Sequence, residues 1–213
     1  GDINSAVNSE NGGGTDAGLV AGQCLGSISY CIASGNVTGI GYVGGIVGQL
    51  GDVWTTENPG SITACSFTGA INSNRPVNND TGREGSFGGG ICGMSSNNSN
   101  IEFCVANANI MAEKACNGIS STTVYSASGR IQVGTTDVTN SYAGGNINET
   151  PVNGSTITNS DSTLNIYYEG QMTAQQIVDS LEAARISADH NEFYFDVING
   201  EVVLIIGQRQ SQT

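Results

Sequence analysis

The sequence predicts an all-β protein: a parallel β-helix, or β-solenoid, followed by a small α+β cap. Three observations predict this class. A short pattern of Ile, Cys, Ala, Gly and Val recurs at a fixed register through most of the chain. The recurring positions hold β-branched and small residues in short runs that Gly and Asn interrupt, as in strands joined by turns. Beyond about residue 168 the pattern gives way to a helix-like and then a hairpin-like segment. We therefore divide the chain into a repeat domain, 1–168, and a cap, 169–213.

The clearest copy of the repeat is ISYCIASGNVTGIGYVGGIVG, from Ile28 to Gly48. With its first Ile as position zero, Cys, Ala, Gly and Val stand at plus three, five, seven and nine. Further copies begin at Ile62, Ile101 and Val138, and weaker ones at Ile3, Thr122 and Ile157. Fixed self-similarity of this kind is typical of arrays whose copies stack, because no copy can bury a face alone. The shorter spacing after Ile101 is compatible with a coil that loses one of its sides.

A second phrase follows the better copies and should form its own stacked strands. Its versions are AGLVAG at 17–22, VGGIVG at 43–48, GGGICG at 88–93 and CNGIS at 116–120. Gly at plus seven of the first phrase suits a bend with positive φ. Ile and Val at zero and plus nine should point inward on either side of that bend.

The phrase I-x-x-C-x-A-x-G-x-V followed by VGGIVG resembles the GLUG repeat. The resemblance is close over 28–48, fair over 62–93 and partial over 101–147. It implies a bacterial surface or secreted protein, as in adhesin-like proteins and the accessory segments of some immunoglobulin-cleaving metalloproteases. The sequence has no HExxH zinc motif, so protease activity does not carry over.

One position departs from the GLUG pattern. The family usually has Asn at plus two, which Asn140 and Asn159 keep, whereas Tyr30, Ala64 and Phe103 stand there in the stronger copies.

Three cysteines, Cys31, Cys65 and Cys104, share the plus-three position and should form a buried, reduced ladder. Stacked strands lie about 4.8 Å apart, beyond the roughly 3.5–4.5 Å between Cβ atoms that a disulfide prefers. Free Cys packs well as a small apolar group. The remaining cysteines, Cys24, Cys92 and Cys116, are less constrained. No CxxC pair is present, which argues against zinc.

Composition excludes several partners. The net charge of −13 argues against nucleic acid and against an anionic membrane surface, since both require Lys and Arg. No apolar stretch is long enough to span a membrane. Because the chain opens inside a degenerate copy at GDINSAV, we expect targeting sequence upstream. The expected location is extracellular or on the bacterial cell surface.

The C-terminal segment carries local signals for its own elements. Thr173 is a helix N-cap and Gln176 can complete a capping box. Apolar residues at helical spacing continue to about Ile186. Asn199-Gly200 between two apolar runs predicts a hairpin with a type I′ turn. We expect this segment to cover the open last coil and protect its strand edge.

Two motifs could carry chemistry, but their contexts argue against it. Gly39, Gly41 and Gly44 spell GxGxxG, yet a strand-like phrase follows where a dinucleotide site needs a helix. His190, the only histidine, has no GxSxG partner motif, so a solvated loop residue is the simpler interpretation.

Acidic residues offer two further candidate sites. Asp52, Glu57, Asp80 and Glu84 could supply paired carboxylates for glycoside hydrolysis, but they lie on insertions and share no repeat position. Oxygen ligands from Asn78 to Glu84 could hold Ca²⁺, but their spacing fails the EF-hand pattern. We predict no catalytic residue, no metal and no cofactor.

Ligand contact is predicted on the two insertions, Gln49–Gly60 and Asn72–Ser86, because loops carry function on repeat scaffolds. The candidate contact residues are Trp54, Arg75, Asp80, Arg83 and Glu84. The first hypothesis is a non-enzymatic extracellular binding or adhesion module for a glycan or a host protein. The alternatives are a polysaccharide-active β-helix enzyme, either a glycoside hydrolase or a lyase, and an inert spacer.

Overall fold

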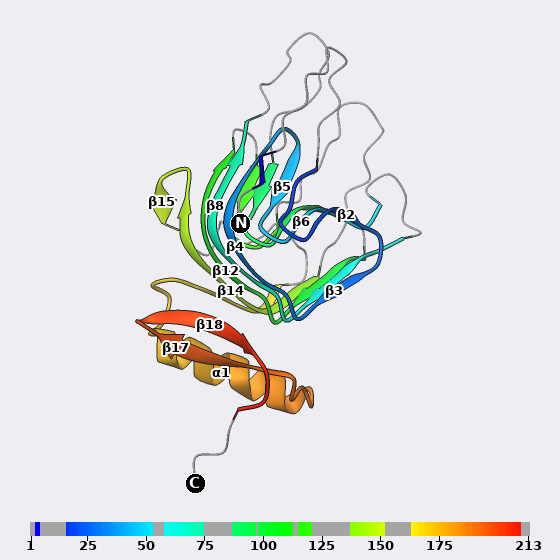
Figure 1. Cartoon of the computed structure of the whole chain (residues 1–213). Helices are drawn as coiled ribbons and strands as arrows, with labels where there is room; N and C mark the ends of the chain where they lie inside the picture. Colours follow the sequence, from blue (N-terminus) through cyan, green and yellow to red (C-terminus); the bar gives the residue numbers. More distant parts are fainter. Residues whose placement is uncertain are drawn as a thin grey trace, which may run out of the picture.

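The computed structural model describes residues 3–4, 16–52, 58–74, 87–96, 98–112, 115–120, 137–151 and 163–209. In this part the protein is mostly β, with one helix and a long, curled parallel sheet (Figure 1). Ten strands form the curled sheet, in the path β1-β4-β8-β12-β14-β11-β7-β3, with β15 and β16 paired to β14. Two smaller parallel sheets, β10-β6-β2 and β13-β9-β5, and a two-stranded hairpin complete the described structure.

The strands fall into groups that follow the repeat. The short strands, which end just before the plus-two residue of each copy, are β3 (Ser27–Ser29), β7 (Ser61–Thr63) and β11 (Asn100–Glu102). The long strands are β4 (Ile32–Gly39), β8 (Ser66–Ser73), β12 (Val105–Ala112) and β14 (Asp137–Ile147). One small sheet holds β5 (Tyr42–Gly44), β9 (Phe87–Gly89) and β13 (Ala115–Asn117), and the other β2 (Ala21–Cys24), β6 (Val47–Leu50) and β10 (Cys92–Ser95).

The remaining elements are two strands and a short edge strand of the curled sheet, then the helix and the hairpin. They are β1 (Ile3–Asn4), β15 (Thr150–Pro151), β16 (Thr163–Tyr168), α1 (Ala174–Ser187), β17 (Phe193–Ile198) and β18 (Glu201–Ile206).

The predicted register is confirmed for the strong copies. Position zero of each copy stacks on the next, Ile28 on Ile62, Ile62 on Ile101 and Ile101 on Val138. The plus-nine residues stack likewise, and all eight side chains of these two columns are buried. The second phrase also pairs in register, with Val43 beside Gly88. Stacking therefore buries a continuous row of apolar side chains that no single copy could bury.

Two weak copies were assigned the wrong register. Ile3 pairs with Val37, which makes it a plus-nine residue. Ile166 pairs with Ser141 and so occupies plus three, not plus nine of a copy beginning at Ile157. The Ile101 copy pairs directly with the Val138 copy, and the weak copy at Thr122 lies outside the described residues.

Each copy bends at plus two, where the backbone takes a left-handed conformation. Tyr30, Ala64, Phe103 and Asn140 have φ of 58°, 51°, 53° and 47°. Asn tolerates this region better than other non-glycine residues. The plus-three side chain hydrogen-bonds back to the plus-one carbonyl, as in Cys104 Sγ to Glu102 O at 3.3 Å and Ser141 Oγ to Thr139 O at 2.8 Å. A small donor at plus three thus satisfies a carbonyl at the bend.

The cysteine column forms no disulfide. Cys65 and Cys104 are completely buried, and burial raises the pKa of Cys65 to about 12. Their thiols therefore remain protonated at neutral pH. Cys31 is only partly buried, contrary to our expectation. It belongs to the first strong copy, so within the described residues the cysteine column continues from it in one direction, toward Cys65.

The predicted helix and hairpin are present at the C-terminus. Thr173 caps α1 in a complete capping box with Gln176. Asn199 and Gly200 join β17 to β18 with φ of 55° and 87°, as a type I′ turn requires. Because these signals are local, the sequence was sufficient to place both elements. We call residues 169–209 the C-terminal segment.

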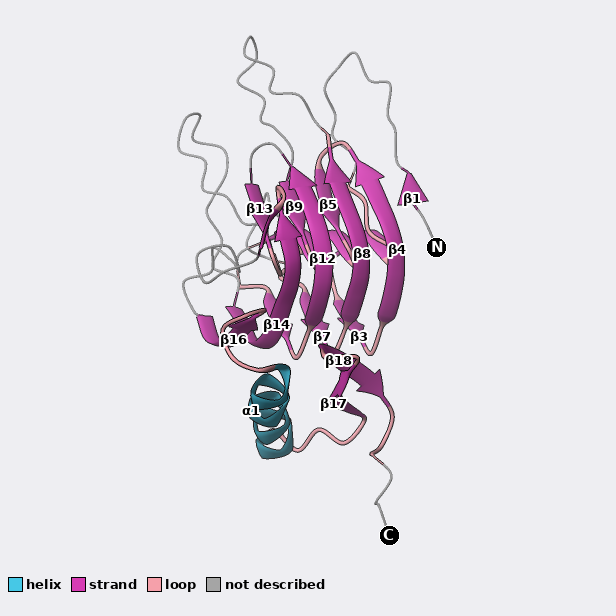
Figure 2. Ribbon diagram, turned by 90° about the vertical axis from the view of Figure 1, so that its left-hand side faces the viewer, coloured by secondary structure: helices cyan, strands magenta, loops and turns pink. Residues whose placement is uncertain are grey.

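Its position differs from the prediction. Instead of covering the last copy, α1 and the hairpin lie against the outside of the bend, across several copies (Figure 2). Their apolar side chains form a second core with Ala64, Phe103, Val105 and Tyr142. The aromatic ring of Tyr30 also lies 6.2 Å from that of Phe193. Tyr30 and Phe103, the two large plus-two residues, thus both contact Phe193 of the C-terminal segment.

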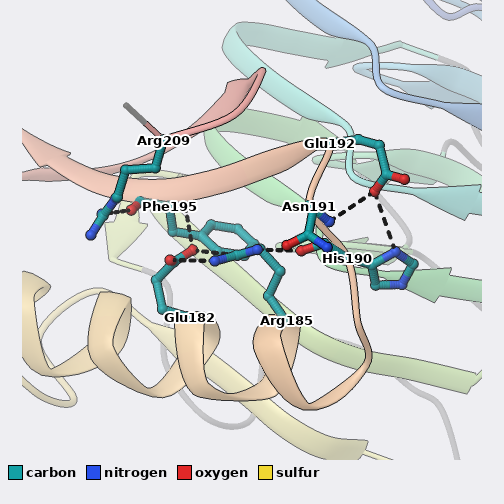
Figure 3. Close-up of polar contacts among 7 residues, drawn as sticks. All are labelled: Glu182, Arg185, His190, Asn191, Glu192, Phe195 and Arg209. Carbon is teal, nitrogen blue, oxygen red and sulfur yellow. Dashed lines mark hydrogen bonds and ion pairs between the residues drawn. The ribbon is translucent and has the colours of Figure 1, made fainter. Parts of the chain in front are cut away.

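Polar contacts join α1 to the hairpin (Figure 3). Arg185 is buried and forms two hydrogen bonds to the carboxylate of Glu182, at 2.9 and 3.0 Å, and a further one to the His190 carbonyl. Glu182 in turn accepts the Phe195 backbone N–H at 2.8 Å. A buried charge is tolerated only when it is paired in this way. The pair therefore fixes the hairpin to the helix.

Candidate functional site

The five predicted contact residues, Trp54, Arg75, Asp80, Arg83 and Glu84, lie outside the described residues. So do Glu57 and the proposed Ca²⁺ ligands from Asn78 to Glu84. The described flanks correct the boundaries of both insertions. Strand β6 continues to Leu50 and β8 continues to Ser73, so each insertion begins later than predicted.

The two sequence motifs have structural surroundings that differ from those of catalytic sites. Gly39 ends β4 and Gly44 ends β5, so GxGxxG contains a strand and is followed by the strand β6 in place of a helix, as expected. His190 lies in the loop between α1 and β17, as expected, but its side chain is only 29% exposed. Its ring packs edge-on against Phe103 at 5.3 Å and lies 5.5 Å from Phe193, and its Nδ1 is 3.9 Å from a carboxylate oxygen of Glu192.

A groove of about 570 Å³ lies between the outer face of the long strands and the C-terminal segment. In Figure 1 the hairpin and α1 lie below the curled sheet. The long strands contribute Asn36, Thr68, Gly69, Ala70, Asn107, Ala108, Asn109, Tyr142 and Gly145. The C-terminal segment contributes Glu169, Gly170, Met172, Ala174, Ile177, Gly200 and Glu201. We call it the interface groove.

The repeat register explains which strand residues reach this groove. Successive side chains of a strand point to opposite faces. Plus five and plus nine point into the core, so plus six and plus eight point outward. The plus-eight row consists of Asn36, Ala70, Asn109 and Asn146, which pair in that order across four strands. The outer face is therefore a polar, amide-rich surface between β4 and β14.

Contacts across the groove orient its polar groups. Asn107 Nδ2 donates to the Val202 carbonyl at 3.2 Å, and Asn146 Nδ2 donates to Asn109 Oδ1 at 3.0 Å. The Gly145 N–H donates to a carboxylate oxygen of Glu169 at 3.0 Å. These bonds position side chains that come from parts of the sequence far from one another.

The interface groove is electrically negative. Burial, with smaller contributions from the charges of Glu169 and Glu201, raises the pKa of Tyr142 to about 12. Arg185 and Arg209 are the only Lys or Arg residues in the described part of the chain, and neither lines the groove. Its described lining can therefore accept and donate hydrogen bonds but offers no cation to an anionic ligand.

The comparisons with known proteins add no name to this site: no family model, no curated protein and no solved structure matches the chain. Within the described ranges, no three His, Cys, Asp or Glu side chains gather as metal ligands would. No helix there has both the length and the apolar character of a membrane span.

Sequence reasoning missed the interface groove because its two sides come from separate segments. A usable signal was nevertheless present. The outward plus-six and plus-eight positions of the first three strong copies are all Ser, Thr, Asn or Ala, with no large side chain and no charge. A row of short polar residues on successive copies indicates a surface kept open for contact.

Among the described residues, Asp16 is a half-buried acidic side chain outside the groove whose ionisation is affected by burial. Desolvation raises its pKa from 3.8 to about 6, although its carboxylate accepts a hydrogen bond from the Tyr42 backbone N–H. The folded protein thus holds this proton more tightly than the unfolded chain. The stability that Asp16 contributes is present below pH 3.8 and is lost as the pH rises to about 6.

We therefore expect Asp16→Asn to raise the free energy of unfolding at pH 7 by about 1–2 kcal/mol, a value reduced for the partial exposure of the side chain. At pH 4 the gain should largely disappear. Denaturant unfolding at both pH values measures this, with Asp137→Asn, at an exposed position, as the control. An equal effect of Asp16→Asn at both pH values contradicts the assignment.

Proposed function

We propose that this protein is a non-enzymatic extracellular binding or adhesion module, with its contact surface at the interface groove. The observation that carries the proposal is the groove itself, which joins the outward faces of consecutive repeat copies to the C-terminal segment. Ligand sites are typically concave, with a few convergent polar groups.

The finer architecture belongs to the same proposal. Successive copies contribute strands to the three parallel sheets in the same order. Each copy first adds strands to the curled sheet, then β5 or β9 to the second sheet, and then β6 or β10 to the third. This order supports a β-solenoid built from GLUG-like repeats. Such scaffolds present extended surfaces to partners. A glycan or an extracellular host protein is the partner class that an acidic, amide-rich surface suits, and a secreted or cell-surface location follows from that role.

Blocking the groove tests the proposal. Ala70 lies in the plus-eight row and lines the groove, so Ala70→Trp should fill it without removing a hydrogen-bonding side chain. Ser29→Trp places the same residue at an exposed strand position that does not line the groove. The full chain is screened against a glycan array and against immobilised fibronectin, collagen and mucin.

We expect binding to at least one of these probes, a loss of at least tenfold in affinity for Ala70→Trp, and little change for Ser29→Trp. Equal binding by both variants places the contact surface elsewhere, as on the two insertions that carry Trp54 and Arg83. A complete lack of binding in the wild type overturns the proposal and favours the inert spacer.

One observation favours a second function. Glu169 and Glu201 share the groove, and paired carboxylates perform glycoside hydrolysis when they flank the scissile bond. They are not displayed by consecutive copies, since both belong to the C-terminal segment. Release of reducing ends from a polysaccharide by the wild type, abolished by Glu169→Gln or Glu201→Gln, would establish the enzyme over the binding module.

A further inference from the structure

We infer that the interface groove takes a neutral, hydroxyl-rich glycan chain that lies across the long strands, along the plus-eight row. This inference rests on the proposed function, since it specifies the ligand of the same groove. It assigns the ligand class from the charge, the hydrogen-bonding character and the shape of the lining.

The charge of the groove argues against anionic ligands. Glu169 and Glu201 are its charged residues among the described lining, and no Lys, Arg or His is present to pair with a sulfate, phosphate or uronate. Recognition of such groups relies on charge-assisted hydrogen bonds from cations. Tyr142 adds no further negative charge, because its phenol stays protonated with a pKa of about 12.

The hydrogen-bonding groups suit sugar hydroxyls. An Asn amide both donates and accepts, as a hydroxyl does, whereas a carboxylate only accepts. Asn36 and Asn109 stand in one row with Ala70 between them, and Asn146 continues the row beyond the groove. Neighbouring strands repeat at about 4.8 Å. A linear glycan laid across them meets a new side chain at intervals comparable to one sugar unit.

The shape of the floor allows close approach to the backbone. Short residues at the centre of the groove, Gly69, Ala70, Ala108 and Gly145, leave the strand backbone accessible from outside. Met172, which is 38% exposed, and Ala174 provide an apolar flank along the C-terminal side. A sugar ring, with hydroxyls at its rim and C–H groups on its faces, matches a polar floor with an apolar flank.

A cationic ligand such as a lysine-rich peptide is the main competitor, since the groove is negative. Such a ligand would be held by Glu169 and Glu201 and would gain little from the plus-eight amides. The amide row and the apolar flank therefore favour a neutral glycan. This difference separates the two ligands experimentally, because each depends on different side chains.

The test measures binding of the full chain to soluble polysaccharides by isothermal titration calorimetry. Laminarin, dextran and xyloglucan are the neutral probes, polygalacturonate and alginate the anionic probes, and chitosan oligomers and polylysine the cationic probes. Variants are Asn109→Ala and Asn36→Ala in the row, with Ser29→Ala, at an exposed position that does not line the groove, as the matched control. Circular dichroism melting verifies that each variant is folded.

We expect binding to at least one neutral polysaccharide that changes little between low and high salt. Asn109→Ala should weaken it at least fivefold, Asn36→Ala by a smaller factor, and Ser29→Ala by less than twofold. Anionic probes should not bind.

Two results overturn the inference. One is binding to polylysine or chitosan alone, lost in high salt and insensitive to Asn109→Ala. The other is the absence of binding to every neutral polysaccharide. If Ala70→Trp still abolishes binding to an immobilised protein in either case, the proposed function survives and the glycan assignment fails.

Discussion

Replacing Phe103 by alanine should lower the free energy of unfolding by about 3–5 kcal/mol, the usual cost of removing a buried Phe side chain. Phe103 is completely buried at the bend of the third strong copy. Its ring lies 5.4 Å from that of Phe193 and 6.4 Å from that of Phe195, so it belongs to the core between the curled sheet and the C-terminal segment. The loss should therefore loosen that segment before it affects the sheet.

Hydrogen exchange and denaturant unfolding together check this result. Backbone amides of Phe193–Ile198 should exchange faster in Phe103→Ala, whereas those of β4 and β8 should stay protected. Tyr30→Ala is the matched control, because Tyr30 holds the same repeat position and the same left-handed backbone but is 40% exposed. It should cost about 1 kcal/mol or less. A cost for Phe103→Ala as small as that for Tyr30→Ala would show that Phe103 does not anchor the C-terminal segment.

The sequence was sufficient wherever the controlling interactions are local or strictly repeated. Thr173 with Gln176, and Asn199 with Gly200, each lie within one turn of chain, so the helix start and the hairpin could be predicted. The stacking of Ile62 on Ile28 follows from repetition, since each copy must bury the same positions. The copies at Ile3 and Ile157 failed because a lone apolar match does not fix the register. Ile3 fits position zero and plus nine equally well, and Ile166 stands at plus three, where the stronger copies have a small side chain.

The groove and the location of the C-terminal segment required the structure. Tyr30 and Phe103 replace the expected Asn at plus two, and the sequence marks this as a departure without a cause. The cause is packing against Phe193, which lies far along the chain. Asn107 and Val202 likewise meet across 95 residues. No periodic pattern reports such a contact, because the C-terminal segment is not a repeat.

The two adjacent glycines of VGGIVG, Gly44 and Gly45, are required by close contacts with neighbouring atoms, and this predicts a second large effect. A Cβ atom added at Gly44 would lie 2.1 Å from the Val47 carbonyl oxygen, 2.6 Å from the Gly93 nitrogen and 2.9 Å from the Cys92 Cα. All three are backbone atoms, so no side chain can rotate away to make room. At the neighbouring Gly45 the added atom would meet the Phe67 ring at 2.2 Å. Only glycine therefore fits at these two positions, where adjacent copies are in close contact.

Gly44→Ala should consequently lower the free energy of unfolding by at least about 3 kcal/mol, the upper end of the usual cost of overpacking. Gly26→Ala is the control: an added Cβ there meets nothing within 4 Å, and its backbone does not need positive φ. It should be neutral, or stabilise the fold by up to about 1 kcal/mol, because alanine reduces the freedom of the unfolded chain. Denaturant midpoints of the two variants against the wild type measure the difference. A Gly44→Ala protein that unfolds at the wild-type midpoint would mean that adjacent copies lie further apart than described, and the stacked register of the second phrase would then be wrong.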